Sequence, residues 1–288
     1  MDLFFVIFVE ILYGIASLAL ISIGLAVVFG MMKVINLAHG EFMMLGGYAT
    51  ITAVNLGINV FVAMLIIAPL LVGVIGLLVE RLVIRHLYGR LVDTMLATWG
   101  LSLFFIGIVT MIFGNTTTSI TTPIRGFAVG NYQINGYNFF IIFMACLLLI
   151  AIYAVLKITR LGLIARGTMQ SADIAASLGY NSDHIYMVTF FCGASLTGLA
   201  GAIFAPLVGL VPTSGSAYMA EAFITVVAGG PSLIIGLLSG ATAFGAINQI
   251  VTFTSSAVLG EVAILVAAVI ILRLIPKGIT SRFFKGKM

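Results

Sequence analysis

Asn36, His39 and Glu41 stand close together inside an otherwise apolar stretch of the chain. An amide, an imidazole and a carboxylate supply hydrogen-bond donors and acceptors, but an ionisable group at the centre of a bilayer costs about 2.5–3.5 kcal/mol or more. Two explanations follow, and each is compatible with the other. The side chains line a water-filled path for a polar solute, or they cap helix ends and bond the backbone groups that a break in a helix sets free.

Two further polar sets have the spacing expected of a solute path. Tyr218, Glu221 and Thr225 are separated by three and four residues, so a helix places them on one face. Thr98 and Trp99 add a hydroxyl and the single indole of the chain. A Trp near the end of a span is most often an interface anchor, but this one lies inside its apolar run, which also allows a place in the pathway. All of these are candidate pathway residues.

The remaining charged residues of the apolar runs have simpler explanations. Three acidic residues fall near the ends of runs, where contact with interfacial water accounts for them: Glu10, Asp93 and Glu261. Glu80 is followed by Arg81 and Arg85, which predicts an ion pair at the membrane edge.

The sequence holds no Walker-type phosphate loop, no H-E-x-x-H motif and no G-x-S-x-G nucleophile turn. We therefore expect a protein that is not an enzyme and has no cofactor or metal site. Cys146 and Cys192 lie in apolar runs without a second cysteine or histidine nearby, which favours a buried structural role. An ordinary channel is also disfavoured, because neither an Arg-rich sensor helix nor a carbonyl filter motif is present.

Composition sets the fold class. Of 288 residues, 62% are hydrophobic and 8% are charged, against about 25% charged in soluble domains. Several apolar runs reach the roughly 20 residues that cross about 30 Å of hydrocarbon as a helix. The sequence predicts an all-α polytopic membrane protein, a single permease domain over residues 1–288 with about 8–10 transmembrane helices, some of them broken. The first run, residues 3–30, lacks the basic start of a signal peptide and is expected to be a retained span.

Basic residues predict the orientation. Of the 13 Lys and Arg residues, only Arg125 lies outside four clusters, at Lys33, at 81–90, at 157–166 and at 273–287. If all four face the cytoplasm, the positive-inside rule is satisfied, with the N-terminus outside and the C-terminus in the cytoplasm. These clusters account for the net charge of +4, which therefore does not indicate a nucleic-acid partner. The expected elements are 3–30, 36–56, 60–83, 94–114, 139–156, 187–211, 218–229, 231–251 and 261–275.

Two segments, 35–48 and 214–231, look like interrupted helices. Each places an acidic residue, Glu41 or Glu221, ahead of a pair of glycines, and the expected topology sends them in opposite directions. This resembles the inverted repeat of many transporters, whose interrupted helices meet near the midplane and hold the solute. The alternative is coincidence in a chain with 32 glycines, most of which serve close helix packing.

Residues 157–185 form a polar, basic island between apolar runs. We call this segment the polar loop. A membrane protein that keeps one large loop of this kind usually contacts another protein through it, which favours a transporter driven by a separate motor subunit.

Five segments carry a family resemblance: INLAHGEFMMLGGYAT, LATWGLSL, TRLGLIARGTMQSADIAASLGYN, FITVVAGGPSLIIG and IPKGI. In this order they resemble the permease subunits of branched-chain amino-acid and urea-type ABC importers, over nearly the whole chain. The resemblance implies the ABC importer permease fold in a bacterial-type cytoplasmic (inner) membrane. It also implies a homologous second permease, two cytoplasmic ABC ATPases that hydrolyse the ATP, and an extracytoplasmic solute-binding protein.

By the same likeness, residues 166–181 resemble the coupling helix that docks in a cleft of the ATPase. The alanines would fit a groove closely, Gly179 suits the position just after a helix, and Asp173 near the start suits the helix dipole. Asp173 and Ile174 precede the alanines in place of the fuller E-A-A pattern. The expected coupling residues are Arg166, Gln170, Asp173, Ala175, Ala176 and Gly179.

The solute is expected to be urea or a short amide first, because LATWG and YMAEAFITVVAGG look closer to the urea-type branch and no Lys or Arg lies deep in a span. A branched-chain amino acid is the alternative, since helix N-termini can also bind a carboxylate. A stand-alone channel or ion-coupled carrier is the alternative of another class, although it has no need of the polar loop. A scaffold without transport has little reason to bear polar residues inside spans.

Overall fold

A computed structural model shows a helical protein and describes residues 2–130, 132–230 and 232–282. Among the residues so described, seven helical stretches are long and apolar enough to cross a membrane. The expected all-helical, polytopic fold class is confirmed. The stretches are α1 (Asp2–Met32), α3–η1–α4 (Val60–Val62, Ala63–Ile67, Ala68–Leu82), α5 (Leu91–Phe113), α6 (Tyr137–Ile158), α9 (Ser182–Phe204), α11 (Leu233–Thr254) and α12 (Ala257–Leu274), which continues towards η3 (Ile279–Arg282).

Shorter elements connect these spans. The helices α2 (His39–Asn55) and α10 (Gly215–Gly229) have 17 and 15 residues, fewer than a full crossing needs. Together with the seven stretches they correspond to the nine apolar segments expected from the sequence. The remaining elements are η2 (Ile84–Leu87), β1 (Phe127–Val129), β2 (Tyr132–Ile134), α7 (Arg160–Gln170) and α8 (Ala172–Ser177).

The largest boundary error concerns α9, expected over 187–211. The helix begins at Ser182 because the side chain of Asn181 caps it, with Oδ1 accepting the backbone N–H of Asp183 at 3.0 Å. It ends at Phe204, and Leu210 beyond it forms an isolated β-bridge with Thr118. The cap is a local hydrogen-bond feature and the bridge joins residues 92 apart, and hydropathy reveals neither.

The chain folds into two compact units, which are described separately. Unit 1 contains Met1–Ser22, Thr122–Ile150 and Glu221–Met288, and unit 2 contains Ile23–Thr121 and Ala151–Ala220. Helices α1, α6 and α10 continue from one unit into the other, so the expected single permease domain stays a prediction.

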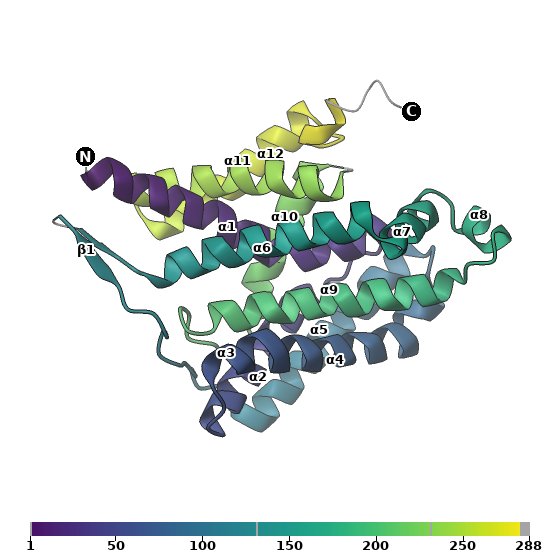
Figure 1. Ribbon diagram of the computed structural model, residues 1–288, viewed down its shortest axis with the longest axis horizontal. Coiled ribbons are helices and arrows are strands. Elements are labelled where there is room, and N and C mark those ends of the chain that lie inside the picture. Colours follow the sequence, from purple (N-terminus) through teal and green to yellow (C-terminus); the bar gives the residue numbers. More distant parts are fainter. Residues whose placement is uncertain (1, 131, 231, 283–288) are drawn as a thin grey trace. The chain divides into compact units, whose positions relative to one another are not determined.

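Unit 2 is built on α2, α4 and α9, which lie side by side (Figure 1). Glycines set their separation. A methyl group on Gly198 of α9 would meet Val72 of α4, and one on Gly201 would meet the backbone of Met43 in α2. Such close approach gains van der Waals contact where lipid gives no hydrophobic drive to helix association. The core between these helices contains Phe42, Tyr48 and Phe190.

Unit 1 pairs α11 with α12 around Phe244 and Ile264. The hydroxyl of Thr280, in η3, donates to the carbonyl of Gly229 at 2.7 Å and so ties the segment after α12 to the end of α10. In the loop before α6, β1 and β2 form an antiparallel hairpin, with Phe127 opposite Ile134. This hairpin packs on the first turns of α1 through an apolar cluster with Val6 and Val9. Pro231, expected to begin the span of α11, lies outside the described residues, as does the basic tail 283–288.

The break expected in segment 35–48 lies ahead of the glycine pair. Residues 33–38 are not helical, Lys33 has a φ of 53°, and α2 then runs without interruption through Gly46 and Gly47. We call residues 33–38 the unwound segment. The glycines serve packing, since a methyl group on Gly46 would meet the backbone of Gly198.

Gly46→Ala is expected to destabilise the protein by about 1–3 kcal/mol, the cost of overpacking, because the obstructing atoms are backbone and cannot rotate away. Gly107→Ala in α5 is the matched control, since a methyl group there has nothing within 4 Å and alanine favours a helix by up to about 1 kcal/mol. Thermal unfolding of both variants in detergent checks this. Equal midpoints for Gly46→Ala and wild type would contradict the close packing of α2 on α9.

Candidate functional site

The unwound segment satisfies its backbone groups with side chains. Asn36 Oδ1 accepts the N–H of Ala38 at 3.1 Å, and the carbonyl of Asn36 accepts the N–H of His39 at 3.2 Å. The N–H of Leu37 donates to the hydroxyl of Thr98 in α5, also at 3.1 Å. The contacts of Asn36 therefore fit the second explanation offered by the sequence, in which side chains bond the backbone groups that a helix break sets free. Thr98 is a further partner of the segment, 61 residues away along the chain.

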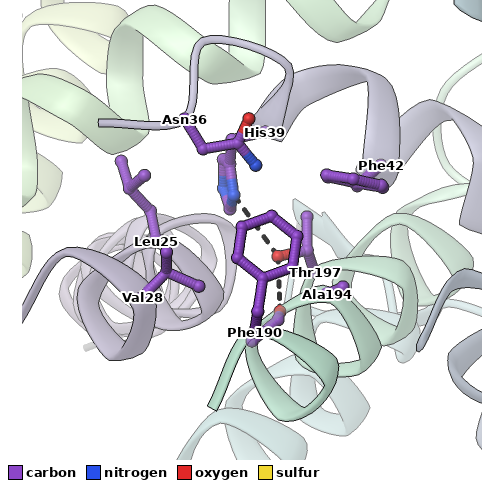
Figure 2. A pocket seen from close by; sticks show the side chains of 9 residues that line it. Leu25, Val28, Asn36, His39, Phe42, Phe190, Ala194 and Thr197 are labelled. Carbon is purple, nitrogen blue, oxygen red and sulfur yellow. Dashed lines mark hydrogen bonds between the residues drawn. The ribbon is translucent and has the colours of Figure 1, made fainter. Parts of the chain in front are cut away.

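His39, the first residue of α2, is buried against α9. Its Nδ1 lies 3.3 Å from Thr197 Oγ1, and that hydroxyl lies 2.8 Å from the carbonyl of Gly193 (Figure 2). Because Thr197 has one proton and the carbonyl can only accept, this arrangement favours Nδ1–H of His39 as donor to Thr197. His39 is thereby held in one orientation between the unwound segment and α9.

A small cavity lies among His39, α1 and α9. Its volume is about 10 Å³, close to the smallest that holds one water molecule. Asn36 and His39 turn their polar atoms towards this region, while Phe42 and Phe190 cover its sides (Figure 2). The remaining lining residues are Leu25, Val28, Gly193, Ala194 and Thr197. A cavity of this size holds at most about one water molecule in this conformation.

Glu41 lies in the first turn of α2 and is 1% exposed. Within the described part of the chain, its Oε2 has no hydrogen-bond partner. A carboxylate in the first turn is favoured by the helix dipole, which offsets part of the cost of its burial. The candidate residues Asn36, His39, Glu41 and Thr98 thus gather around the start of α2.

The other candidate pathway residues lie elsewhere. Trp99 is 56% exposed and points away from the interior that receives Thr98, so it does not join the group at α2. Tyr218 contacts Phe204, with ring centroids 6.3 Å apart. Glu221 and Thr225 follow on α10 in unit 1, where the Thr225 hydroxyl donates to the Glu221 carbonyl at 2.7 Å.

The two short helices meet at their N-termini. A methyl group on Gly40 of α2 would collide with the carbonyl of Gly215, the first residue of α10. The starts of the two helices therefore face each other within unit 2. This is the arrangement expected when interrupted helices converge.

The polar loop folds into α7 and α8, which lie beside the start of α9 (Figure 1). Gly179 takes the left-handed conformation with a φ of 87°, as expected for the residue after a helix. Its N–H bonds the carbonyl of Ala176 at 2.9 Å and the N–H of Tyr180 bonds Ala175 at 3.0 Å, which together make a Schellman cap.

Only part of the expected alanine face is exposed for contact with another protein. Ala175 is buried at 6% exposure, whereas Ala176 is exposed together with Ile174 and Leu178. Arg166 and Gln170 lie on the exposed side of α7, where Arg166 Nε donates to the carbonyl of Gly162 at 3.2 Å. The backbone of Asp173 is in α8, but its side chain lies outside the described residues.

Residues 83–90 form the corner between α4 and α5. Here the expected ion pair between Glu80 and Arg85 is wrong. Arg85 pairs with Asp183 of α9, Nη2 to Oδ2 at 2.6 Å, and not with Glu80. Glu80 instead accepts a short hydrogen bond from the hydroxyl of Tyr88. The hydrogen bond and charge of Asp183 raise the pKa of Arg85 above its ordinary value. Burial, then the bond to Glu80, raises the pKa of the Tyr88 hydroxyl.

Three residues of this arrangement carry no sequence signal that reveals their role. Asp183 and Tyr88 look like ordinary loop residues, and Thr197 looks like one of several threonines in an apolar run. Only the N-cap pattern Asn181-x-Asp183 could have been found in advance. The buried role expected for the cysteines is wrong, because Cys146 and Cys192 are both exposed on the helix surfaces as free thiols. The described residues contain no group of three metal-ligand side chains.

Comparison with known proteins matches the chain to one family over most of its length. The profile described as "Branched-chain amino acid transport system / permease component" matches residues 7–274. The high-affinity branched-chain amino acid transport system permease protein LivH of Escherichia coli (strain K12) is 28% identical, over 93% of this chain and 92% of LivH.

Two other relatives are also described as branched-chain amino acid transport permeases. BraD of Pseudomonas aeruginosa, a permease of the same description, is 30% identical over 80% of this chain and 82% of its own length. The probable branched-chain amino acid transport permease protein LivH of Methanocaldococcus jannaschii is 25% identical over 92% and 88%. No solved structure matches the chain significantly.

Thr98→Val is expected to destabilise the protein by about 1–3 kcal/mol, because valine keeps the shape of threonine but leaves the half-buried N–H of Leu37 without its acceptor. Thr98→Ser retains the hydroxyl and is the control. Thermal unfolding in detergent and amide exchange at Leu37 measure the effect. Unchanged exchange at Leu37 in Thr98→Val would remove Thr98 as the support of the unwound segment.

Proposed function

We propose, on the premise that this chain belongs to the branched-chain amino-acid permease family of ABC importers, that it forms one half of a membrane path for an aliphatic amino acid. The chain is a multi-pass transport subunit and not the ATPase of its complex. The family match carries the proposal, because it extends over residues 7–274, from the first turns of α1 to the end of α12.

The partners follow from membership of an ABC importer. A homologous second permease completes the path, two cytoplasmic ABC ATPases supply the energy, and an extracytoplasmic solute-binding protein delivers the solute. The complex lies in a bacterial-type cytoplasmic (inner) membrane. The basic clusters support an N-terminus outside and a C-terminus in the cytoplasm, with the polar loop on the ATPase side.

The polar loop is proposed as the docking segment for the ATPase. Its short helix α8 and the residue that caps it present Ile174, Ala176 and Leu178 as exposed apolar residues outside the spans. Gly179 fixes the direction in which the chain leaves α8. Arg166 and Gln170 of α7 present polar groups beside it. Apolar contact at the centre and polar contact at the rim are the ordinary composition of a protein interface.

The solute is proposed to be a branched-chain amino acid. The names of the relatives support this choice over urea or a short amide, the first choice from the sequence. No Lys or Arg inside the spans is needed, because the N-termini of α2 and α10 at Gly40 and Gly215 offer backbone N–H groups for a carboxylate. Glu41 offers an acceptor for the ammonium group. The other proposed pathway residues are Asn36, His39, Thr98, Trp99, Tyr218, Glu221 and Thr225.

Reconstitution of the complex in proteoliposomes tests the function. We expect uptake of labelled leucine that requires ATP, both ATPases and the binding protein, and no uptake of urea or acetamide above background. Uptake that continues without ATP would replace the proposal with a channel or ion-coupled carrier. ATP-driven uptake of urea with none of leucine would keep the permease function and overturn the solute.

Gly179→Pro is expected to abolish ATP-driven uptake while the protein still inserts in the membrane. Proline fixes φ near −65°, which is incompatible with the 87° observed, and it lacks the N–H that bonds Ala176. Gly167→Ala in α7 is the control, since a methyl group there meets nothing within 4 Å. Uptake by Gly179→Pro at the wild-type rate would remove α8 from the coupling mechanism.

A further inference from the structure

We propose that the ion pair between Arg85 and Asp183 is the joint through which force applied to α8 reaches the unwound segment 33–38. The inference rests on the proposed docking of the polar loop on the ATPase. Neither residue lies near the start of α2, so both are positioning residues. All of the contacts that support the proposal lie within unit 2.

The first step joins α8 to α9. The hydroxyl of Ser182 donates to the carbonyl of Ala172 at 3.2 Å, across the turn between the two helices. Asn181 caps α9 by accepting from Asp183 and His184, at 3.0 and 3.4 Å. The Schellman cap at Gly179 fixes the same turn from the other side. A displacement of α8 is therefore passed to the first turn of α9.

The second step joins α9 to the corner 83–90. Asp183 binds Arg85, and one helical turn further on the ring of Tyr186 meets that of Tyr88 edge-on, with centroids 4.9 Å apart. The two contacts are spaced by three residues on both partners, so they hold the two segments along parallel faces. Tyr88 is in turn held by its hydrogen bond to Glu80 of α4.

The third step reaches the unwound segment along α5. The Thr94 hydroxyl lies 3.1 Å from the carbonyl of Leu87 and 2.8 Å from that of Arg90, which binds the first turn of α5 to the corner. Thr98, about 10 Å along the helix from Leu91, accepts the N–H of Leu37. The corner and the unwound segment are thus joined by a single rigid helix.

A second path of contacts runs along α9 and also reaches the start of α2; we call the paths along α5 and α9 the two arms. Thr197 of α9 lies about 21 Å along the helix from Asp183 and contacts His39, the residue that follows the unwound segment. Helices α5 and α9 therefore both start near the ion pair, and each contacts the region around the start of α2 further along its length, at Thr98 and at Thr197. If the pair holds, α5 and α9 move together. If it is absent, the ring contact of Tyr88 with Tyr186 is a weaker link between the corner and α9, and movement of α9 is passed to α5 less completely.

The ion pair contributes little to folding stability, which suits a role in transmitting movement. Its side chains are 46% and 47% exposed, and half-exposed ion pairs add little to stability. It borders a cavity of about 180 Å³, which leaves Arg85 room to shift against Asp183. The other groups that face this cavity are Glu80, Arg81, His184 and Met187. Variants of the pair should therefore fold, which makes the effect on transport measurable.

The test measures leucine uptake and ATP hydrolysis in the same proteoliposomes containing the complete transporter. Arg85→Asp and Asp183→Arg are each expected to assemble and hydrolyse ATP, with the leucine carried per ATP lowered by about twofold to thirtyfold. The double variant restores opposite charges and is expected to regain most of the ratio. Single variants with the wild-type ratio, or a double variant no better than either single one, would overturn the proposal.

A nearby ion pair supplies the control. Arg90 and Asp93 lie 3.8 Å apart at the start of α5, both more than half exposed, and connect no separate elements. Arg90→Asp and Asp93→Arg are expected to leave the leucine carried per ATP unchanged. If Arg85→Asp fails to assemble, Arg85→Gln and Asp183→Asn remove the charge without adding repulsion, and the same ratio decides.

The two proposals fail in different ways. Wild-type uptake that does not depend on ATP would overturn the function and this inference together. ATP-driven wild-type uptake with unaffected pair variants would overturn only the joint.

Discussion

The unwound segment must satisfy its backbone groups away from water, and this constraint organises unit 2. Residues 36–39 are largely buried, and an unpaired N–H there would cost as much as a lost hydrogen bond. Asn36 supplies one acceptor from within the segment and Thr98 supplies another from α5. A helix break inside a membrane protein is tolerated only where such partners exist. The position of α5 beside α2 is therefore a requirement of the break, and any movement of α5 is felt by the segment.

Close packing supplies the second half of the arrangement. Gly198 and Gly201 bring α9 against α4 and α2, and Gly40 brings the starts of α2 and α10 together. Backbones in contact cannot slide independently, because the obstructing atoms have no rotamers to change. Helix α9 therefore combines two properties that a transmitting element needs. One end carries small residues that bind it to the start of α2, and the other carries Asp183 beside the polar loop.

The sequence predicts the helices well, because apolar runs and basic clusters are local signals. Gly179 was identifiable as a helix-ending residue for the same reason. Partners distant in sequence were not identifiable. Arg85 has acidic Glu80 within reach along the chain, yet it binds Asp183, 98 residues away, while Glu80 accepts the hydroxyl of Tyr88. Thr98 and Trp99 look equivalent as neighbours in a polar group, but successive helix positions point about 100° apart, which buries one and exposes the other.

Amide hydrogen exchange over residues 33–40 in the complete transporter tests the central claim most directly. The two states to compare are the nucleotide-free complex and the complex trapped with ATP bound. We expect the protection of Leu37 and Ala38 to differ between these states. The acceptor of the Leu37 N–H, Thr98, moves with α5, and a shift of the segment disturbs the bond between the Ala38 N–H and Asn36 Oδ1. Identical protection of both amides in the two states, in a complex that carries leucine at the expense of ATP, would contradict the claim that force from the polar loop reaches this segment.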